Sequence, residues 1–136
     1  MEKTKHIHLA VYIDHRAARI LAITPEACTE KRIATDSGGR GHVHHHAGTP
    51  GPGHAEMDKG FLDAVSAALK EARHILILGP AEAKFELARH LQRHDPELRA
   101  RVIGIENLDR CSAAGICAFA RPLFRKADLM AGATQR

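Results

Sequence analysis

The chain has 136 residues, a formal net charge of +4 and a pI near 9.2, so it suits one domain and its mild basic excess is compatible with an RNA partner. Hydrophobic residues make up 44% of the sequence and aromatic residues only 4%, so the core must be mainly aliphatic. No apolar run approaches the roughly 18 residues of a membrane span, and the first ten residues lack the apolar region of a signal peptide. We expect a single cytoplasmic domain over residues 1–136, with its core between about 6 and 127.

The first part of the chain predicts an antiparallel meander. In residues 6–13, apolar side chains alternate with the others, which is the period-two pattern of a half-buried strand. After a turn at 14–17, residues 18–24 form a second expected strand. Residues 29–35 are polar and carry two adjacent cations, which suits an exposed edge strand. The connections are short, so the three strands should be antiparallel.

The second part predicts alternating helices and strands. Residues 58–72 place apolar side chains at helical spacing. Ile75–Leu78 carries no polar side chain, which is typical of a strand buried on both faces, and Gly79-Pro80 then breaks it. A helix over 81–94 follows, with Phe85, Ala88 and Leu91 expected to point inward.

A last strand and a last helix complete the pattern. Residues 101–105 are expected to be another buried strand. Ser112 can cap the final helix, Pro122 should kink it, and the tail from 129 is expected to be loose. The order is three strands followed by alternating helices and strands. It predicts an α/β fold with a ribonuclease H-like, mixed five-stranded sheet, an antiparallel meander followed by parallel strands, with helices packed on it.

Residues 36–56 are rich in glycine and proline and cannot bury a core, so we predict a long mobile loop, most mobile at 38–54. The loop contains five histidines, and His-rich tracts often bind metal. The candidate ligands for zinc, nickel or copper are His42, His44, His45, His46 and His54. The other interpretation is a solvated loop that contacts phosphate, since the spacing matches no hydrolytic metal motif.

The three cysteines give no clear sign of a functional site. Cys28, Cys111 and Cys117 form an odd set without a CxxC pair, and we interpret them as small buried hydrophobes or free thiols rather than as a disulfide or zinc site.

A ribonuclease H-type nuclease needs several convergent carboxylates. The first strand has no acid before Asp14, and the acids of the first helix have no evident partners, so the sequence argues against that activity.

The element order and the segment ILILGPAEAKFEL resemble the middle domain of the eukaryotic and archaeal class-1 peptide-chain release factors and of pelota. In that family a strand ends in Gly-Pro or Gly-Ser, and a Lys with an acidic-hydrophobic pair follows, here residues 84–87. RVIGIENLD and CSAAGICAFA are similar to a later strand and a Gly-containing helix. The resemblance covers most of residues 7–125.

The resemblance also places Ser37-Gly38-Gly39-Arg40-Gly41 where the release factors carry Gly-Gly-Gln. In that family the loop enters the peptidyl-transferase centre, and the Gln helps to position the hydrolytic water. Arg40 cannot accept a hydrogen bond, so the resemblance implies binding without hydrolysis of peptidyl-tRNA. Pelota likewise lacks Gly-Gly-Gln, although the glycine pair can equally be a flexible turn.

These observations predict a small translation-associated protein that binds ribosome or tRNA. They favour a binding protein over an enzyme. Its expected RNA contacts are Gly38, Gly39, Arg40, Lys84 and Arg89. One alternative is a metal-binding module or metal-dependent enzyme that uses the His-rich loop, and another is an interaction domain whose ligand is a protein. No cofactor follows firmly from the sequence.

Overall fold

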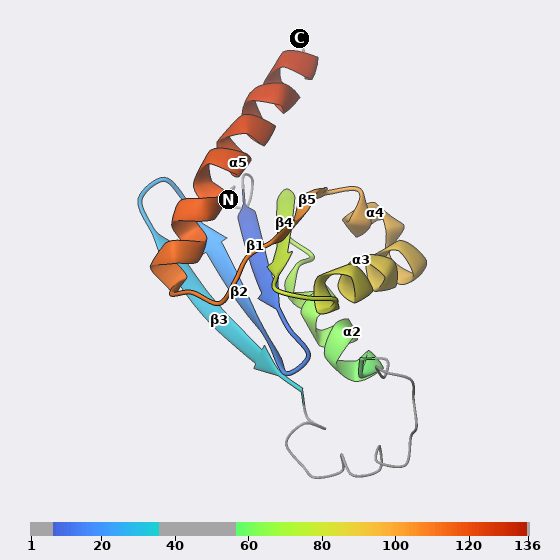
Figure 1. Cartoon of the computed structure of the whole chain (residues 1–136). Helices are drawn as coiled ribbons and strands as arrows, with labels where there is room; N and C mark the ends of the chain where they lie inside the picture. The colour runs from blue at the N-terminus through green and yellow to red at the C-terminus, as the bar shows by residue number, and fades with distance from the viewer. Residues whose placement is uncertain (1–6, 36–56, 136) are drawn as a thin grey trace, which may run out of the picture.

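A single mixed sheet of five strands forms the centre of the protein (Figure 1), as seen in a computed structural model that describes residues 7–35 and 57–135, with side chains to residue 131. The spatial order of the strands is β3-β2-β1-β4-β5. Their bounds are His8–Ile13 for β1, Ala17–Ile23 for β2, Cys28–Ala34 for β3, His74–Gly79 for β4 and Val102–Asn107 for β5. The predicted mixed five-stranded α/β fold is therefore confirmed.

Strand direction changes from one half of the sheet to the other. β1 pairs antiparallel with β2, and β2 pairs antiparallel with β3, which makes the predicted meander. β1 also pairs with β4 in parallel, and β4 pairs with β5 in parallel. The central register aligns His8 with His74 and Tyr12 with Leu78. The amino ends of the two central strands therefore lie side by side.

Helices cover both faces of the sheet, which gives three layers (Figure 1). One face packs against α2 (Lys59–Ala68), α3 (Ala83–His94) and the short α4 (Pro96–Arg99), through a core that includes Val11, Leu87 and Leu91. The other face packs against α5 (Ala113–Gln135), through a second core that includes Tyr12 and Ile116. In residues 7–35 and 57–135, no helix combines the length and the apolar character needed to cross a bilayer.

The starts of α2, α4 and α5 follow the capping rules. Asp58 accepts a hydrogen bond from the N–H of Phe61 and begins α2, and Asp95 accepts one from Leu98 and begins α4. The hydroxyl of Ser112 accepts the N–H of Gly115 at 3.0 Å, so the predicted cap of the last helix is confirmed. Each of these polar side chains satisfies a backbone donor that would otherwise lack an intrahelical partner.

Several local predictions were wrong. β1 is buried on both faces rather than half-buried, because α5 covers the side that carries Ala10 and Tyr12. Phe85 is 39% exposed, and Leu87 fills the inward position on α3 instead. β5 is an edge strand and only partly buried, since β4 is its sole neighbour in the sheet.

The end of the chain also differs from the prediction. The expected loose tail from 129 is helical, because α5 continues to Gln135. The helix runs through Pro122 as one element. In Figure 1 its last turns extend beyond the sheet. Leu129 and Met130, on this extension, are 68% and 59% exposed.

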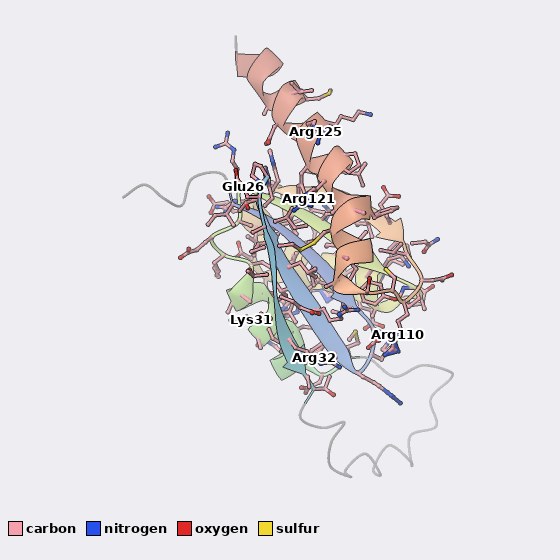
Figure 2. The ribbon with its side chains drawn as sticks, turned by 90° about the vertical axis from the view of Figure 1, so that its left-hand side faces the viewer. Glu26, Lys31, Arg32, Arg110, Arg121 and Arg125 are labelled. Carbon is pink, nitrogen blue, oxygen red and sulfur yellow. A yellow bond between two sulfur atoms is a disulfide. The ribbon has the colours of Figure 1, made fainter. Side chains whose placement is uncertain are left out.

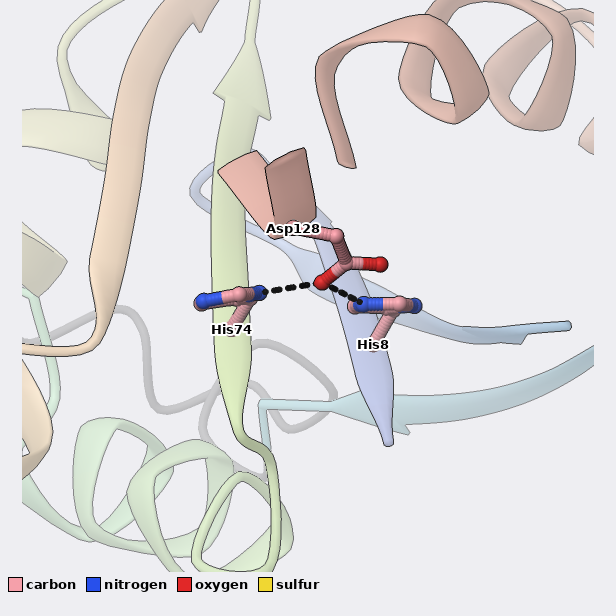
Figure 3. A group of neighbouring side chains, drawn as sticks. All are labelled: His8, His74 and Asp128. Carbon is pink, nitrogen blue, oxygen red and sulfur yellow. Dashed lines mark hydrogen bonds and ion pairs between the residues drawn. The ribbon is translucent and has the colours of Figure 1, made fainter. Parts of the chain in front are cut away.

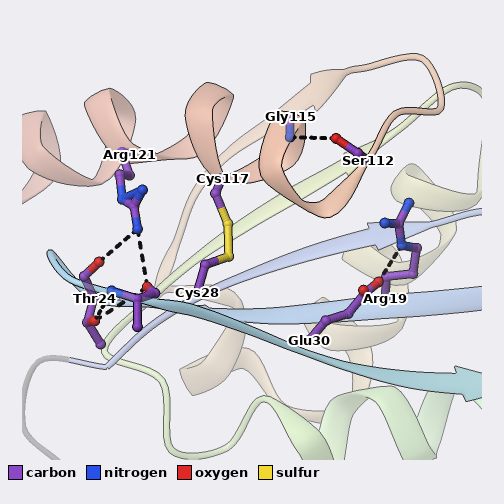
Figure 4. Close-up of a disulfide and its surroundings, with 9 residues drawn as sticks. Arg19, Thr24, Cys28, Glu30, Ser112, Gly115, Cys117 and Arg121 are labelled. Carbon is purple, nitrogen blue, oxygen red and sulfur yellow. Dashed lines mark hydrogen bonds and ion pairs between the residues drawn. A yellow bond between two sulfur atoms is a disulfide. The ribbon is translucent and has the colours of Figure 1, made fainter.

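The cysteine prediction was wrong for two of the three residues. Cys28, at the start of β3, forms a disulfide with Cys117 of α5, and Cys111 is the free thiol (Figure 4). The two residues are 89 positions apart in sequence, and only the packing of α5 on the meander brings them together. The bond ties the outermost strand to the helix that covers its face. Disulfides persist mainly in oxidising compartments, so the expected cytoplasmic location stays a prediction.

Gly79 is required where β4 ends. A Cβ atom at this position would lie 2.5 Å from the carbonyl oxygen of Ile13 in β1, and a backbone atom cannot swing away as a side chain can. We expect Gly79→Ala to lower the free energy of unfolding by about 1–3 kcal/mol, as overpacking does. Gly60 is the matched control, since the nearest atom to its Cβ is Asp58 Oδ2 at 3.4 Å. Gly60→Ala should leave stability unchanged or raise it by up to about 1 kcal/mol. Equal stabilities in urea titrations would contradict this account.

Candidate functional site

Basic side chains are spread along the side of the molecule formed by the free edge of β3 and by α5 (Figure 2). We call this the β3–α5 basic face. Lys31 and Arg32 lie on β3, Arg110 lies in the connection before α5, and Arg121 and Arg125 lie on α5 itself. All are exposed except Arg121, which is partly buried. Lys31, Arg32, Arg110 and Arg125 form no ion pair with another described residue, so their charges are available to an anionic partner.

One acid on this side of the molecule is paired with an arginine that is not part of the basic face. Glu30 accepts a hydrogen bond from Nε of Arg19 at 2.5 Å, and Nη1 of the same arginine donates to the carbonyl of Cys111 at 2.9 Å (Figure 4). The charge of Glu30 is thus balanced by Arg19, from the neighbouring strand. Two further acids belong to this side of the molecule, Glu26 in the turn before β3 (Figure 2) and Asp109, which directly precedes Arg110.

Arg121 has a structural role as well as a charge. Its Nη2 donates to the carbonyls of Thr24 at 3.1 Å and Ala27 at 3.2 Å (Figure 4). These carbonyls belong to the turn between β2 and β3. The arginine therefore holds α5 against the meander a few residues from the disulfide.

Of the five residues predicted as RNA contacts, the structure describes two, Lys84 and Arg89. Gly38, Gly39 and Arg40 lie outside the described residues. The same holds for the proposed metal ligands His42, His44, His45, His46 and His54. The predicted mobility of this loop therefore stays a prediction. Arg89 is exposed, but it lies on α3, on the other side of the sheet from α5. Lys84 is only 2% exposed. Of the predicted set, only Arg89 presents its charge on the described surface.

Lys84 is a buried residue of the first turn of α3. Its ammonium donates to the carbonyl of Ala81 and lies 4.7 Å from the centre of the Phe85 ring. It therefore fixes the turn between β4 and α3 instead of reaching outward. The sequence placed it correctly at the helix start, but only the packing decides which way a first-turn side chain points.

A second group of polar residues lies at the amino ends of the two central strands (Figure 3). His8 begins β1, His74 begins β4, and Asp128 reaches them from α5. Oδ1 of Asp128 lies 3.0 Å from Nε2 of His8 and 3.3 Å from Nδ1 of His74. The two imidazole rings are nearly parallel, with their centres 5.6 Å apart. The sequence analysis missed this cluster.

The environment of the cluster favours neutral imidazole at His74. Burial lowers the pKa of His74, and the charges of His8 and Arg73 act in the same direction while Asp128 opposes them. Nδ1 of His74 is buried and makes no hydrogen bond within the described part of the chain, although Asp128 is in reach. A cavity of about 210 Å³ adjoins the cluster. Its walls are formed by His8, Ile23, Thr24, Pro25, Arg121, Phe124, Arg125 and Asp128.

The acids considered for a nuclease have local roles. Asp14 accepts the backbone N–H groups of Arg16 and Ala17 in the turn between β1 and β2. Asp58 caps α2, and Asp63 lies 3.0 Å from Nε2 of His90. These contacts account for each carboxylate without a metal ion.

Comparisons with known proteins identify the fold. No family model and no curated protein matches the sequence. Among solved structures, Archaeoglobus fulgidus Pelota is similar with a TM-score of 0.61 and 14% identity, over 98% of this chain and 38% of that one. Saccharomyces cerevisiae Dom34 has a TM-score of 0.59 and 12% identity, over 93% of this chain and 38% of that one. The archaeal translation termination factor aRF1 has a TM-score of 0.53 and 13% identity, over 94% of this chain and 42% of that one.

The chain therefore has a fold found in Pelota, Dom34 and aRF1, and it spans well under half the length of those proteins. The resemblance noted from the Gly-Pro turn and the element order is confirmed at the level of the fold.

The burial of Lys84 changes what its removal should do. Lys84→Ala leaves a gap where the four-carbon stem packs and removes the bond to Ala81, so we expect the free energy of unfolding to fall by about 1–3 kcal/mol. Arg89→Ala, five residues along the same helix, removes an exposed side chain and should change stability by no more than about 0.5 kcal/mol. Chemical denaturation of the two variants measures the difference. Similar values would mean that Lys84 is solvent-exposed in solution.

Proposed function

We propose that this chain is a translation-factor domain that binds the ribosome or tRNA through the β3–α5 basic face. The observation that carries the proposal is the similarity of nearly the whole chain to Pelota. Dom34, which has the same fold, is described as a translation termination-like factor involved in RNA quality control pathways, and aRF1 as a translation termination factor. A shared fold does not by itself give a shared function, so the surface must support the proposal independently.

The charge distribution supplies that support. Lys31, Arg32, Arg110 and Arg125 are exposed cations without carboxylate partners among the described residues. Clustered cations attract the phosphate backbone, and the release of counterions makes such binding strong at low salt and weak at high salt. Lys31 and Arg32 lie on an edge strand, where long side chains can reach a partner without disturbing the core. An anionic polymer is the partner that this surface fits.

The binding experiment compares two pairs of cations. Lys31→Gln with Arg32→Gln removes two charges from the basic face, and Arg89→Gln with Arg93→Gln removes two exposed charges from α3. Ribosome co-sedimentation of the untagged full chain at several salt concentrations measures both. We expect the first pair of substitutions to weaken binding by roughly 1–3 kcal/mol. The slope of the logarithm of the binding constant against the logarithm of the salt concentration should fall by about two, one for each charge removed. The second pair should behave like the unmodified chain.

The possible outcomes distinguish an error in the assigned binding face from an error in the proposed ribosome binding. Loss of binding in the α3 pair only would place the interface on the side that carries Arg89 and would refute the basic face. Salt-independent association, or none at low salt, would refute ribosome binding itself. Circular dichroism of each variant verifies that the fold is intact, because neither pair contributes to the apolar cores.

We also expect no hydrolysis of peptidyl-tRNA. The resembling factors use Gln after Gly-Gly, whereas this chain has Arg40, whose guanidinium cannot accept a hydrogen bond from water. Incubation with ribosomes that carry labelled peptidyl-tRNA should release peptide no faster than buffer does. Arg40→Gln alone should not create full activity, since the His-rich segment also differs from the family. Release above the buffer rate by the unmodified chain would disprove this expectation.

A further inference from the structure

The histidine–aspartate cluster combines residue types that bind transition metals. His8, His74 and Asp128 offer two nitrogens and one oxygen that all lie within 4.8 Å of one another, and no other such group occurs in residues 7–35 and 57–135. They come from three separate elements, β1, β4 and α5. The parallel register of β1 and β4 places the two histidines directly side by side, with both rings on the α5 side of the sheet (Figure 3).

The distances fit a small tetrahedral ion. Zinc binds nitrogen and oxygen ligands at about 2.0–2.1 Å, which places neighbouring ligand atoms about 3.3–3.4 Å apart. The carboxylate oxygen of Asp128 lies 3.3 Å from Nδ1 of His74 and 3.0 Å from Nε2 of His8. The two histidine nitrogens lie within 4.8 Å of each other, and an ion bound by all three atoms requires them to come to the same spacing.

The protein contacts satisfy the two histidines unequally, since Nδ1 of His74 lies 3.3 Å from Asp128 Oδ1 without forming a hydrogen bond. Asp128 and His8 form a hydrogen bond, but the buried Nδ1 of His74 has no hydrogen-bond partner among the described residues. A buried polar atom without a well-aligned hydrogen bond costs free energy, and a bound ion would satisfy it.

We propose that His8, His74 and Asp128 bind one divalent transition-metal ion, zinc above all, with its fourth position open to the adjoining cavity. Two imidazoles with one carboxylate select zinc and related ions over magnesium and calcium, which prefer oxygen ligands. Three protein ligands and an open position are the pattern of zinc sites that hold a water or an exogenous ligand. The cavity, at about 210 Å³, has room for that ligand.

The site would also join α5 to the sheet. The disulfide and Arg121 hold the first part of this helix to the meander, and Asp128 lies two turns beyond Arg121. An ion at this point connects the helix to both central strands. None of the three ligands belongs to the β3–α5 basic face, but Arg121 and Arg125 of that face line the cavity beside the cluster.

The test must first remove the competing histidines. In a full-length background chain, the five loop histidines His42, His44, His45, His46 and His54 are changed to Asn. The protein is prepared without thiol reductant, so that the disulfide stays closed and cannot offer thiolates. Zinc is then titrated by calorimetry, and cobalt is used as a spectroscopic probe whose visible absorption identifies four-coordinate geometry. We expect one zinc ion per chain and a tetrahedral cobalt spectrum.

Two ligand variants and one matched control are made in this background. Asp128→Asn changes a partly exposed carboxylate with little change of shape, and His74→Gln removes a nitrogen ligand. Each should weaken zinc binding by more than the roughly 10–100-fold that loss of an outer-shell contact causes. His90→Gln is the control, because His90 forms a similar pair with Asp63 at 3.0 Å on the opposite side of the sheet. It should bind zinc as the background chain does.

A thermal melt supplies a second measurement. Zinc should raise the melting temperature of the background chain and of His90→Gln, because a ligand that binds only the native state stabilises it. Asp128→Asn should show no such rise although its circular dichroism without zinc is unchanged. The proposal is overturned if the background chain binds no zinc, or if zinc binding survives both ligand substitutions.

Discussion

The parallel pairing of β1 with β4 is the constraint on which the rest of the structure depends. It joins the amino-terminal meander to the later α/β part, and it puts both central strands in contact with helices on two sides. Gly79 marks how closely the strands approach, since a methyl group there would collide with the backbone of Ile13. The same pairing aligns His8 with His74, so one backbone register determines both the core packing and the polar cluster.

The sequence predicted the sheet because its signals are local. Ile75–Leu78 is apolar throughout, Gly79-Pro80 ends the strand, and the polar side chains of 29–35 mark an edge. Details that depend on the opposite layer were less predictable. The burial of both faces of β1 depends on α5, more than 100 residues later in the chain, and the inward position of Leu87 rather than Phe85 depends on how α3 rotates against the sheet.

The candidate sites were harder to predict for the same reason. A positive charge in a first helical turn suggested Lys84 as a phosphate contact, but the side chain turns inward and bonds to Ala81. Arg32 and Arg125 are far apart in sequence, and they share a face only because α5 crosses the edge of the meander (Figure 2). One signal was available: both central strands begin with histidine. Its meaning requires the parallel register, which single-sequence patterns do not provide.

The bond between Cys28 and Cys117 gives the covalent structure an unusual topology. The two cysteines are 89 positions apart, so the bond closes a large covalent loop of chain. This loop contains α2, β4, α3 and the whole glycine- and histidine-rich segment from 36 to 56. A protease that cuts the chain once inside this covalent loop therefore separates no fragment. The two pieces remain one molecule of unchanged mass apart from the added water, and they separate only after reduction. A nick in the segment that resembles the release-factor loop would pass unnoticed on a non-reducing gel.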